Sequence, residues 1–240
     1  KRLENLLVRR KNMKYENIKE AVFIERPNRF IANVCIDGNE EKVHVKNTGR
    51  CRELLLKGCR VFLEESKNSA RKTKYSLVAV YKGERLINMD SQIPNYVAEE
   101  ALKKGIIKEI GIPDFVKREV KYSQSRFDIY YEKDGRKGFI EVKGVTLEKN
   151  GEVLFPDAPT ERGTKHIKEL IKAKKEGYEA AVLFVIQMKD VSFFAPNAET
   201  DKDFSQALKN AKEEGVNILA YDCDVKEDEI VLKDKVEVRV

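Results

Sequence analysis

Short runs of alternating apolar and polar residues fill the first third of the chain. AVFIE, RFIANVCID, EKVHVK, RVFLEE, KYSLVAVY and RLINMD follow one another between residues 15 and 90. Alternation with a period of two is typical of strands that bury one face, and turn residues such as Asp37-Gly38 and Lys82-Gly83 separate the runs. A short helical segment, RELLLKG at 52–58, is expected between the third and fourth strands. Five or so strands with one helix in that place predict a small barrel of the OB type.

The pattern changes after Met89, where helical periods alternate with longer apolar runs. PNYVAEEALKKG predicts a helix that ends before Gly105, and TERGTKHIKELIKAKKEG at 160–177 predicts a second one. The unbroken apolar run AAVLFVIQM is typical of a strand that is covered on both faces. A helix near 201–214 and the strand NILAY complete the pattern. The sequence therefore predicts a barrel domain over residues 1–90 and an α/β domain over residues 91–240.

A predicted hairpin in the second domain places two acids opposite each other. In RFDIYYEKDGRKGFIEVKG, residues 126–144, Asp134-Gly135 is a strong signal for a tight turn. With that turn Asp128 faces Glu141, unless a bulge shifts the register. Side chains alternate along a strand, so facing residues share a face. The shared face is predicted to carry Arg126, Asp128, Tyr130, Phe139, Glu141 and Lys143, and the core-like face Phe127, Ile129, Tyr131, Ile140 and Val142.

Two carboxylates in facing positions need a compensating charge. Their Cβ atoms would lie ~5 Å apart, and at an effective dielectric near 20 their repulsion is on the order of 3 kcal/mol. One explanation is a charge lattice on a solvated face, in which Arg126 and Lys143 pair with the two acids. The other is a divalent cation held between hard oxygen ligands, with Lys143 beside it. The hairpin alone leaves both explanations open.

Composition limits the class of protein. The chain has 240 residues, of which 37% are charged and 41% hydrophobic, the balance of a soluble globular protein. No apolar run approaches the ~18 residues of a membrane span, and the basic start KRLENLLVRRK lacks the apolar stretch of a signal peptide. We therefore expect a cytoplasmic protein without a membrane partner. Four cysteines without C-x-x-C spacing favour buried free thiols, and His44 and His166 offer little material for a histidine-centred triad.

Positive charge is concentrated in the first third. Residues 1–90 contain 21 Lys and Arg against 12 Asp and Glu, a net charge of +9, whereas residues 91–240 contain 26 against 29, a net charge of −3. A basic barrel suggests nucleic acid as the anionic partner, and the alternative is a solvated basic surface. The candidate contacts are Arg29, Lys46, Arg50, Arg52, Lys72 and Lys74, with Phe30 and Tyr75 as aromatic candidates that are more often core than stacking platforms.

Several stretches resemble known proteins. The order helix, three strands, helix and strand, with two acids and a lysine on the hairpin, resembles the core of the PD-(D/E)xK nuclease superfamily. NTGR at 47–50, EVKY at 119–122, FIEVKGVTL at 139–147 and FPDAPTERGTKHIKEL at 155–170 are similar to the sugar fermentation stimulation protein A family. The resemblance spans about residues 20–222. It implies an OB-like N-terminal barrel followed by a nuclease-like α/β domain with a mixed central sheet.

The resemblance also implies roles for single residues. Asp128 and Glu141 would bind Mg²⁺ or Mn²⁺, and Lys143 would be the catalytic lysine. Val142 would add its backbone carbonyl to the metal ligands. The superfamily often takes a further carboxylate from the first core helix, for which Glu100 is the better candidate and Glu99 the second.

Phosphate contacts in the second domain are also part of the expected site. Arg126 on the hairpin is one candidate. The start of the second helix offers Thr160, Arg162 and Lys165, where backbone N–H groups and basic side chains can hold a phosphate. Ordinary helix capping explains those residue types equally well.

The family is described as DNA-binding, and its name points to regulation of sugar utilisation genes. Three functions are compatible with the sequence: a metal-dependent nuclease, a DNA-binding regulator that keeps the nuclease fold as a scaffold, and, more weakly, an RNA-processing factor. The intact second acid, spacer and lysine favour the nuclease slightly. The oligomeric state stays open, with a homodimer among the options.

Overall fold

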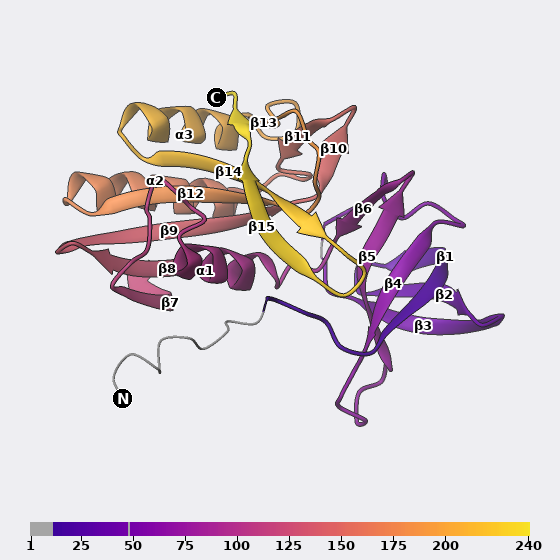
Figure 1. Cartoon of the computed structure of the whole chain (residues 1–240). Coiled ribbons are helices and arrows are strands. Elements are labelled where there is room, and N and C mark those ends of the chain that lie inside the picture. Colours follow the sequence, from indigo (N-terminus) through magenta and orange to yellow (C-terminus); the bar gives the residue numbers. More distant parts are fainter. Residues whose placement is uncertain (1–11, 48) are drawn as a thin grey trace, which may run out of the picture.

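The computed structural model describes residues 12–47 and 49–240, so the basic start at 1–11 and Thr48 of the NTGR string lie outside the described residues. A barrel and an α/β domain lie side by side (Figure 1). Among the described residues, no helix is long and apolar enough to cross a membrane. The prediction of buried free thiols holds for Cys51 and Cys223, whereas Cys35 and Cys59 are free and only half-buried.

Six strands build the barrel, as the alternating runs predict. The sheet order is β3-β2-β1-β4-β5-β6, and a further parallel pairing of β3 with β5 closes it. Inward-facing side chains such as Val34, Val43, Leu63 and Leu77 are fully buried in its core. The strands are β1 (Ile18–Asn28), β2 (Ile31–Ile36), β3 (Asn39–Val45), β4 (Arg60–Glu65), β5 (Tyr75–Lys82) and β6 (Arg85–Asn88).

The predicted helix at 52–58 does not form. The segment makes single turns, in which the Leu54 and Leu55 N–H groups both donate to the Cys51 carbonyl, at 3.2 and 3.0 Å. Gly58, with a φ of 89°, then ends it. A helix needs a costly first turn that a run of seven residues barely repays. This segment therefore connects β3 to β4 as an irregular loop.

A six-stranded mixed sheet forms the centre of the α/β domain, in the order β15-β14-β12-β9-β8-β7. β12 pairs in parallel with β9 and with β14, whereas the outer pairs are antiparallel. The predicted barrel followed by a nuclease-like α/β domain with a mixed sheet is confirmed. The strands are β7 (Phe115–Tyr122), β8 (Ser125–Lys133), β9 (Arg136–Val145), β12 (Glu179–Ile186), β14 (Asn217–Val225) and β15 (Ile230–Lys235).

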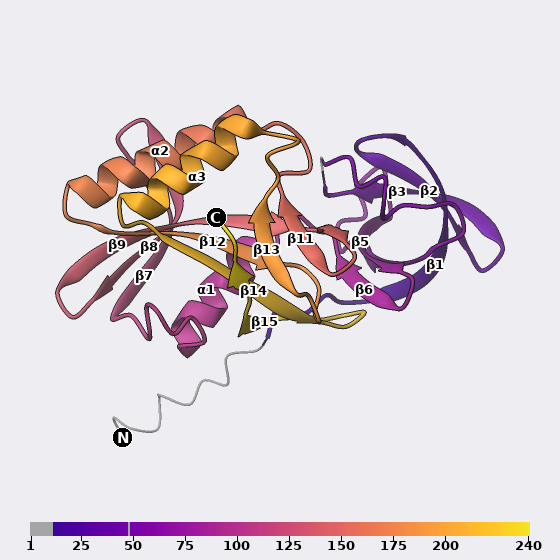
Figure 2. The same ribbon diagram turned by 90° about the horizontal axis from the view of Figure 1, so that it is seen from above.

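Three helices cover this sheet from both sides. α1 (Pro94–Lys104) contacts one face, and α2 (Glu161–Lys175) and α3 (Lys202–Glu213) lie side by side over the other (Figure 2). Capping explains their ends: Gly105 closes α1 with a φ of 69°, and Thr160 caps the start of α2. The apolar run of β12 is buried along nearly its whole length, as expected for a strand between two helical layers.

A small second sheet, which the sequence analysis did not predict, lies between the large sheet and the barrel (Figure 2). Its order is β10-β11-β13-β16. Glu148 of this sheet accepts from Lys82 of the barrel at 2.6 Å and pairs with Arg85 at 3.0 Å. The small sheet therefore joins the two domains. Its strands are β10 (Leu147–Lys149), β11 (Glu152–Phe155), β13 (Phe193–Pro196) and β16 (Glu237–Val238).

Candidate functional site

The hairpin of β8 and β9 forms with the predicted register. Its turn is Asp134-Gly135, with φ angles of 50° and 74°. Facing pairs run from the turn to Ile129 and Ile140. Asp128 and Glu141 are the next residues of the two strands. The register is thus confirmed up to the pair that precedes the two acids.

The strict alternation of side chains fails at Asp128. Phe127 packs on Phe139 with ring centroids 5.0 Å apart, on the sheet face that α2 covers. Alternation predicted it on the opposite face, where Ile129 lies with the α1 residues. In the neighbouring strand Glu119 has a φ of 55°, which twists the backbone at this point. Asp128 therefore lies between the two faces, where β8 departs from β9.

Two hydrogen bonds hold the Asp128 carboxylate at this split. The Val142 N–H donates to Oδ2 at 2.8 Å, and Asn95 Nδ2 of α1 donates to Oδ1 at 2.8 Å. The N–H and C=O of one strand residue project toward the same neighbouring strand. The Val142 carbonyl consequently points toward β8, on the side of β9 where Asp128 lies.

Glu141 is buried beneath α2, with 1% of its surface exposed. Lys143 Nζ donates to its Oε1 at 2.6 Å, and His166 Nδ1 of α2 contacts the same oxygen. Its other oxygen, Oε2, is buried and has no hydrogen-bond partner among the described residues. One explanation of the hairpin was a charge lattice on a solvated face, and it is wrong for Glu141 because this side chain is buried. Of the two cations predicted to pair with the acids, Lys143 pairs with Glu141, whereas Arg126 pairs with Glu119.

The surroundings shift the two carboxyl groups in opposite directions. Burial, followed by the charge of Glu141, raises the pKa of Asp128 against the opposing effects of its hydrogen bonds and of Lys143. Burial also acts to raise the pKa of Glu141, but His166 and Lys143 outweigh it, and that pKa is lowered. The surroundings therefore favour the ionised form of Glu141 and disfavour that of Asp128, and a cation beside Asp128 would act in the opposite direction and lower its pKa.

The atoms at the split fit a hard divalent cation. Mg²⁺, Mn²⁺ and Ca²⁺ prefer carboxylate and carbonyl oxygens, which Asp128, Glu141 and Val142 supply. A buried carboxylate oxygen without a donor is costly, and a cation would satisfy Oε2 of Glu141. Across residues 12–47 and 49–240, no three His, Cys, Asp or Glu side chains are grouped to hold a metal ion. A cation would therefore depend on two carboxylates, a main-chain oxygen and water.

The first helix supplies an amide rather than the predicted carboxylate. Glu100 pairs with Lys104 at 2.6 Å, and Glu99 pairs with Arg118 of β7 at 3.0 Å. Neither glutamate is brought to the hairpin acids, because these cations hold both side chains elsewhere. Asn95, in the first turn of α1, makes the contact instead.

Three of the predicted phosphate contacts are held in ion pairs. Lys46 lies between Glu64 at 3.2 Å and Asp90 at 3.0 Å, with 16% of its side chain exposed. Burial acts to lower the pKa of Lys46, but the two carboxylates outweigh it and raise that pKa. Lys46 thus stabilises the fold, contrary to the expected surface role. The other two are paired at the surface, Lys74 with Glu65 at 3.2 Å and Arg126 with Glu119 at 3.4 Å.

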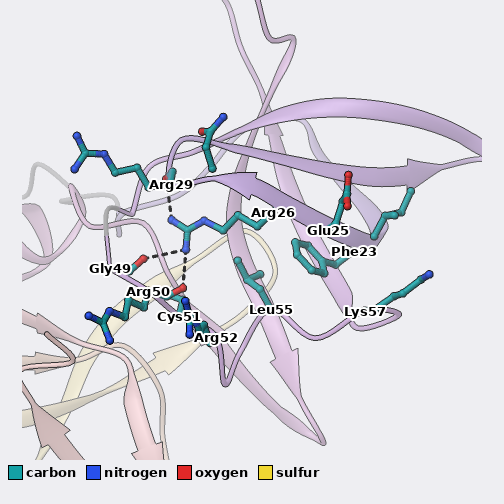
Figure 3. Close-up of a pocket in the computed structure, with 12 residues that line it drawn as sticks. Phe23, Glu25, Arg26, Arg29, Gly49, Arg50, Cys51, Arg52, Leu55 and Lys57 are labelled. Carbon is teal, nitrogen blue, oxygen red and sulfur yellow. Dashed lines mark hydrogen bonds between the residues drawn. The ribbon is translucent and has the colours of Figure 1, made fainter.

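Three predicted contacts gather at one place. Arg29, Arg50 and Arg52 line an open pocket of about 550 Å³ on the barrel (Figure 3). Lys72 is exposed outside this pocket. Of the aromatic candidates, Phe30 is 45% exposed, whereas Tyr75 is buried in the core.

The start of α2 shows the capping that the sequence left as an alternative. Thr160 Oγ1 accepts from the Gly163 N–H at 3.1 Å, and the Thr160 N–H donates to Asp201 at 2.7 Å. Arg162 and Lys165 are exposed. A phosphate contact at this cluster stays a prediction.

Two residues of the site were absent from the sequence prediction, His166 and Asn95. His166 shares the buried stripe of α2 with Gly163, Ile167 and Leu170, and a polar residue on such a stripe is a signal that could have been used. Asn95 had no comparable signal, because its contact with Asp128 depends on where α1 packs.

An OB-type barrel followed by an α/β domain, with two acids and a lysine on the central hairpin, defines a class of two-domain proteins that join a barrel to a nuclease-like fold. The family model described as the SfsA N-terminal OB domain matches residues 24–89, and that of the sugar fermentation stimulation protein RE domain matches residues 92–229. The chain belongs to the sugar fermentation stimulation protein family.

Relatives match over nearly the whole chain. Proteins named sugar fermentation stimulation protein homolog from Clostridium beijerinckii and Alkaliphilus oremlandii are 59% and 57% identical over 227 and 231 residues. These matches cover 94% of this chain, and 99% and 98% of the two relatives. The solved structure of Pyrococcus furiosus SfsA in complex with Ca²⁺ is 27% identical, with a TM-score of 0.86, and the match covers 96% of this chain and 100% of that one.

Proposed function

We propose that the protein binds DNA through its barrel and hydrolyses phosphodiester bonds at a metal-dependent site on the β8–β9 hairpin. One observation carries the proposal: Glu141 is buried, with one oxygen held by Lys143 and His166 and the other without a partner among residues 12–47 and 49–240. A fold seldom keeps such an oxygen unless something else binds there. Asp128, which lies where β8 departs from β9, would be the second metal ligand.

The chain's own residues divide the work. Asp128, Glu141 and the Val142 carbonyl would hold Mg²⁺ or Mn²⁺, which when bound polarises a phosphate oxygen and lowers the pKa of a bound water. Lys143 carries a compact ammonium that stabilises negative charge developing on the phosphate. His166 keeps Glu141 in place. The Ca²⁺ in the Pyrococcus furiosus relative supports a hard cation, because Ca²⁺ and Mg²⁺ both bind oxygen ligands.

Nucleic-acid binding is proposed for the barrel because it is basic and matches an OB domain. Arg29, Arg50 and Arg52 are its proposed phosphate contacts, and RNA stays an alternative to DNA. We also propose that the boundary between the two domains lies at residue 90 and that the protein is cytoplasmic.

A non-catalytic DNA-binding regulator of sugar utilisation genes is the second candidate. Both oxygens of Asp128 already accept hydrogen bonds, from Asn95 and from the Val142 N–H. A carboxylate whose two oxygens both accept hydrogen bonds can stabilise the hairpin without a metal ion. In that case the α/β domain serves as a scaffold for the barrel.

The test is incubation of the purified protein with labelled single-stranded, duplex and branched DNA, and with RNA, in Mg²⁺, Mn²⁺ or EDTA. We expect cleavage that requires the metal and that Glu141→Gln abolishes. Glu199→Gln, which changes an exposed glutamate far from the hairpin in sequence, is the matched control and should cleave normally. Binding without cleavage under every condition would support the regulator instead.

A further inference from the structure

The pocket on the barrel is preformed by an internal arginine. Arg26 of β1 donates to four backbone carbonyls, those of Asn47, Gly49, Arg50 and Arg29, at 2.6 to 2.9 Å. These bonds fix the end of β1 against the segment that follows β3 (Figure 3). The pocket walls therefore do not have to be ordered by a ligand, which lowers the entropic cost of binding.

The rim of this pocket carries cations that the fold does not neutralise. Among the described residues, Arg29, Arg50, Arg52 and Lys57 form no ion pair, in contrast to Lys46, whose two carboxylates hold it. The arginines lie toward Gly49, and Glu25, the acid that lines the pocket, lies at the other end (Figure 3). Unpaired arginines around one concavity are suited to a phosphate, which they bind through two parallel hydrogen bonds.

Part of the pocket lining is apolar. Phe23, Ile24, Cys51 and Leu55 line the pocket together with the arginines. A ligand that fills the pocket should therefore combine an anionic part with an apolar, flat part. A nucleotide whose base is unpaired has both parts, whereas a duplex keeps its bases stacked inside and presents phosphates outward.

The pocket adjoins the hairpin domain through Gly49. This residue also lines a cavity of about 180 Å³ at the domain junction, together with Asp157 and Gly144, the residue that follows Lys143. The Arg50 N–H donates to Asp157 at 3.2 Å across the junction. The two cavities therefore share Gly49 as a wall, and the second one extends to Gly144 near the end of β9.

From these observations we infer that the barrel pocket binds one unpaired nucleotide of the substrate strand, with its phosphate on the arginine rim and its base against Leu55 and Ile24. The inference rests on the proposed function and narrows it, since it makes the substrate a nucleic acid with a single-stranded segment. Arg50 and Arg52 are proposed to hold its phosphate, and the apolar wall at Leu55 to distinguish an unpaired base from a duplex.

The test measures binding without chemistry. A fluorescein-labelled 15-nucleotide DNA of mixed sequence and its blunt duplex are titrated in EDTA with wild type and with Arg50→Ala/Arg52→Ala. The matched control is Lys19→Ala/Lys42→Ala, which removes two exposed charges of β1 and β3 that do not line the pocket. A third variant, Leu55→Ala, removes apolar wall without changing the charge.

We expect wild type to prefer the single strand. The arginine double variant should bind it about tenfold or more weakly, and the slope of log K against log[salt] should fall by about 1.4, or 0.7 for each lost phosphate contact. Leu55→Ala should weaken binding of the single strand severalfold, because it removes apolar surface against which the base is proposed to pack, and should leave the salt slope unchanged. The lysine double variant should stay within about twofold of wild type.

Equal losses in the two double variants, a preference for the blunt duplex, or normal binding by Leu55→Ala would each overturn the inference. Unfolding curves identify a variant that has lost its fold, and Leu55→Ala then remains as the test. Because the assay contains EDTA, it is independent of the metal site. If the arginine variant binds and cuts normally while Glu141→Gln does not cut, the pocket inference and these phosphate contacts fail, and the proposed catalysis at the hairpin stands. If it loses the single strand while wild type never cuts, the pocket stands and the proposed catalysis fails.

Discussion

The barrel pocket and the hairpin of the α/β domain use charge in opposite ways. In the pocket Arg29, Arg50 and Arg52 are exposed and form no ion pair with any residue that the structure describes. On the hairpin Glu141 is buried, and two named side chains fix one of its oxygens. Exposed charges act over several ångströms and are weakened by salt, whereas buried charges depend on their immediate partners. Substitutions should therefore have graded effects in the barrel and large, local effects at the hairpin.

The largest effect is expected for Lys143→Ala. Loss of the ammonium removes stabilisation that matters mainly in the transition state, so cleavage should fall by about 10² or more while DNA and metal binding change only a few-fold. Single-turnover cleavage and fluorescence binding measure the two quantities. Lys168→Ala, an exposed lysine of α2, is the control.

Lys143→Ala could also loosen the hairpin, because Glu141 loses a partner. Melting temperatures with and without Mg²⁺ separate this effect from chemistry. Cleavage that survives the substitution would place the active site elsewhere.

A smaller effect is expected for His166→Ala, which removes the contact from α2 to Glu141. Groups that orient a metal ligand typically contribute 10- to 100-fold to metal affinity. Calorimetry should show Mn²⁺ binding weakened by that factor, with partial recovery in His166→Asn, whose amide can take the place of the ring nitrogen. Unchanged Mn²⁺ affinity with a lower melting temperature would make His166 purely structural.

Within the barrel, Lys46 and Arg52 allow a paired cation to be compared with an unpaired one. Lys46→Ala leaves Asp90, which is fully buried, without its cation, and we expect the free energy of unfolding to drop by about 3 kcal/mol. Single-strand binding should change less than twofold. Arg52→Ala should show the reverse, with stability within about 0.5 kcal/mol of wild type and weaker binding. Chemical denaturation and fluorescence titration measure both, and similar profiles for the two variants would remove the distinction.

The smallest effect concerns pH at the domain junction. Burial acts to raise the pKa of Glu148, but Lys82, the Gly151 N–H and Arg85 outweigh it, so that pKa lies below its ordinary value of 4.5. A group with a lowered pKa in the folded state stabilises the fold above its unfolded pKa, and this contribution is lost as pH falls through the folded value. Glu148→Gln should therefore lower the melting temperature at pH 7 and flatten its dependence on pH below about 4.5. A curve parallel to that of wild type, with Glu199→Gln as the control, would contradict this role.

Local patterns predicted most of the fold. The alternating runs became β1 to β6, and AAVLFVIQM became β12. The small sheet escaped prediction because its strands have only two to four residues and pair with distant segments, as β11 does with β13. The helix predicted at 52–58 is a case in which a local pattern misled. Leu54 and Leu55 of this segment pack in the barrel core from an irregular loop and not from one face of a helix.

The site shows the same difference between local patterns, which were predicted, and long-range contacts, which were not. The hairpin register up to Ile129 and Ile140 follows from one local turn, and it was predicted. The departure of β8 from β9 at Asp128 was not predicted. The contacts of His166 and Asn95 join residues 25 and 33 positions apart and depend on how α2 and α1 pack. Likewise, Lys46 meets an acid 44 positions away. Residue type and spacing cannot show whether a cation is free or already paired.

The most direct test of the central claim is the location of a bound cation. Crystals of the protein grown with Mn²⁺ and measured for anomalous scattering should show a peak between Asp128 and Oε2 of Glu141, close to the Val142 carbonyl, and Glu141→Gln should lose it. This result is expected if the hairpin holds a metal ion. Well-ordered crystals in saturating Mn²⁺ without a peak there, or with one bound elsewhere on the chain, would contradict it.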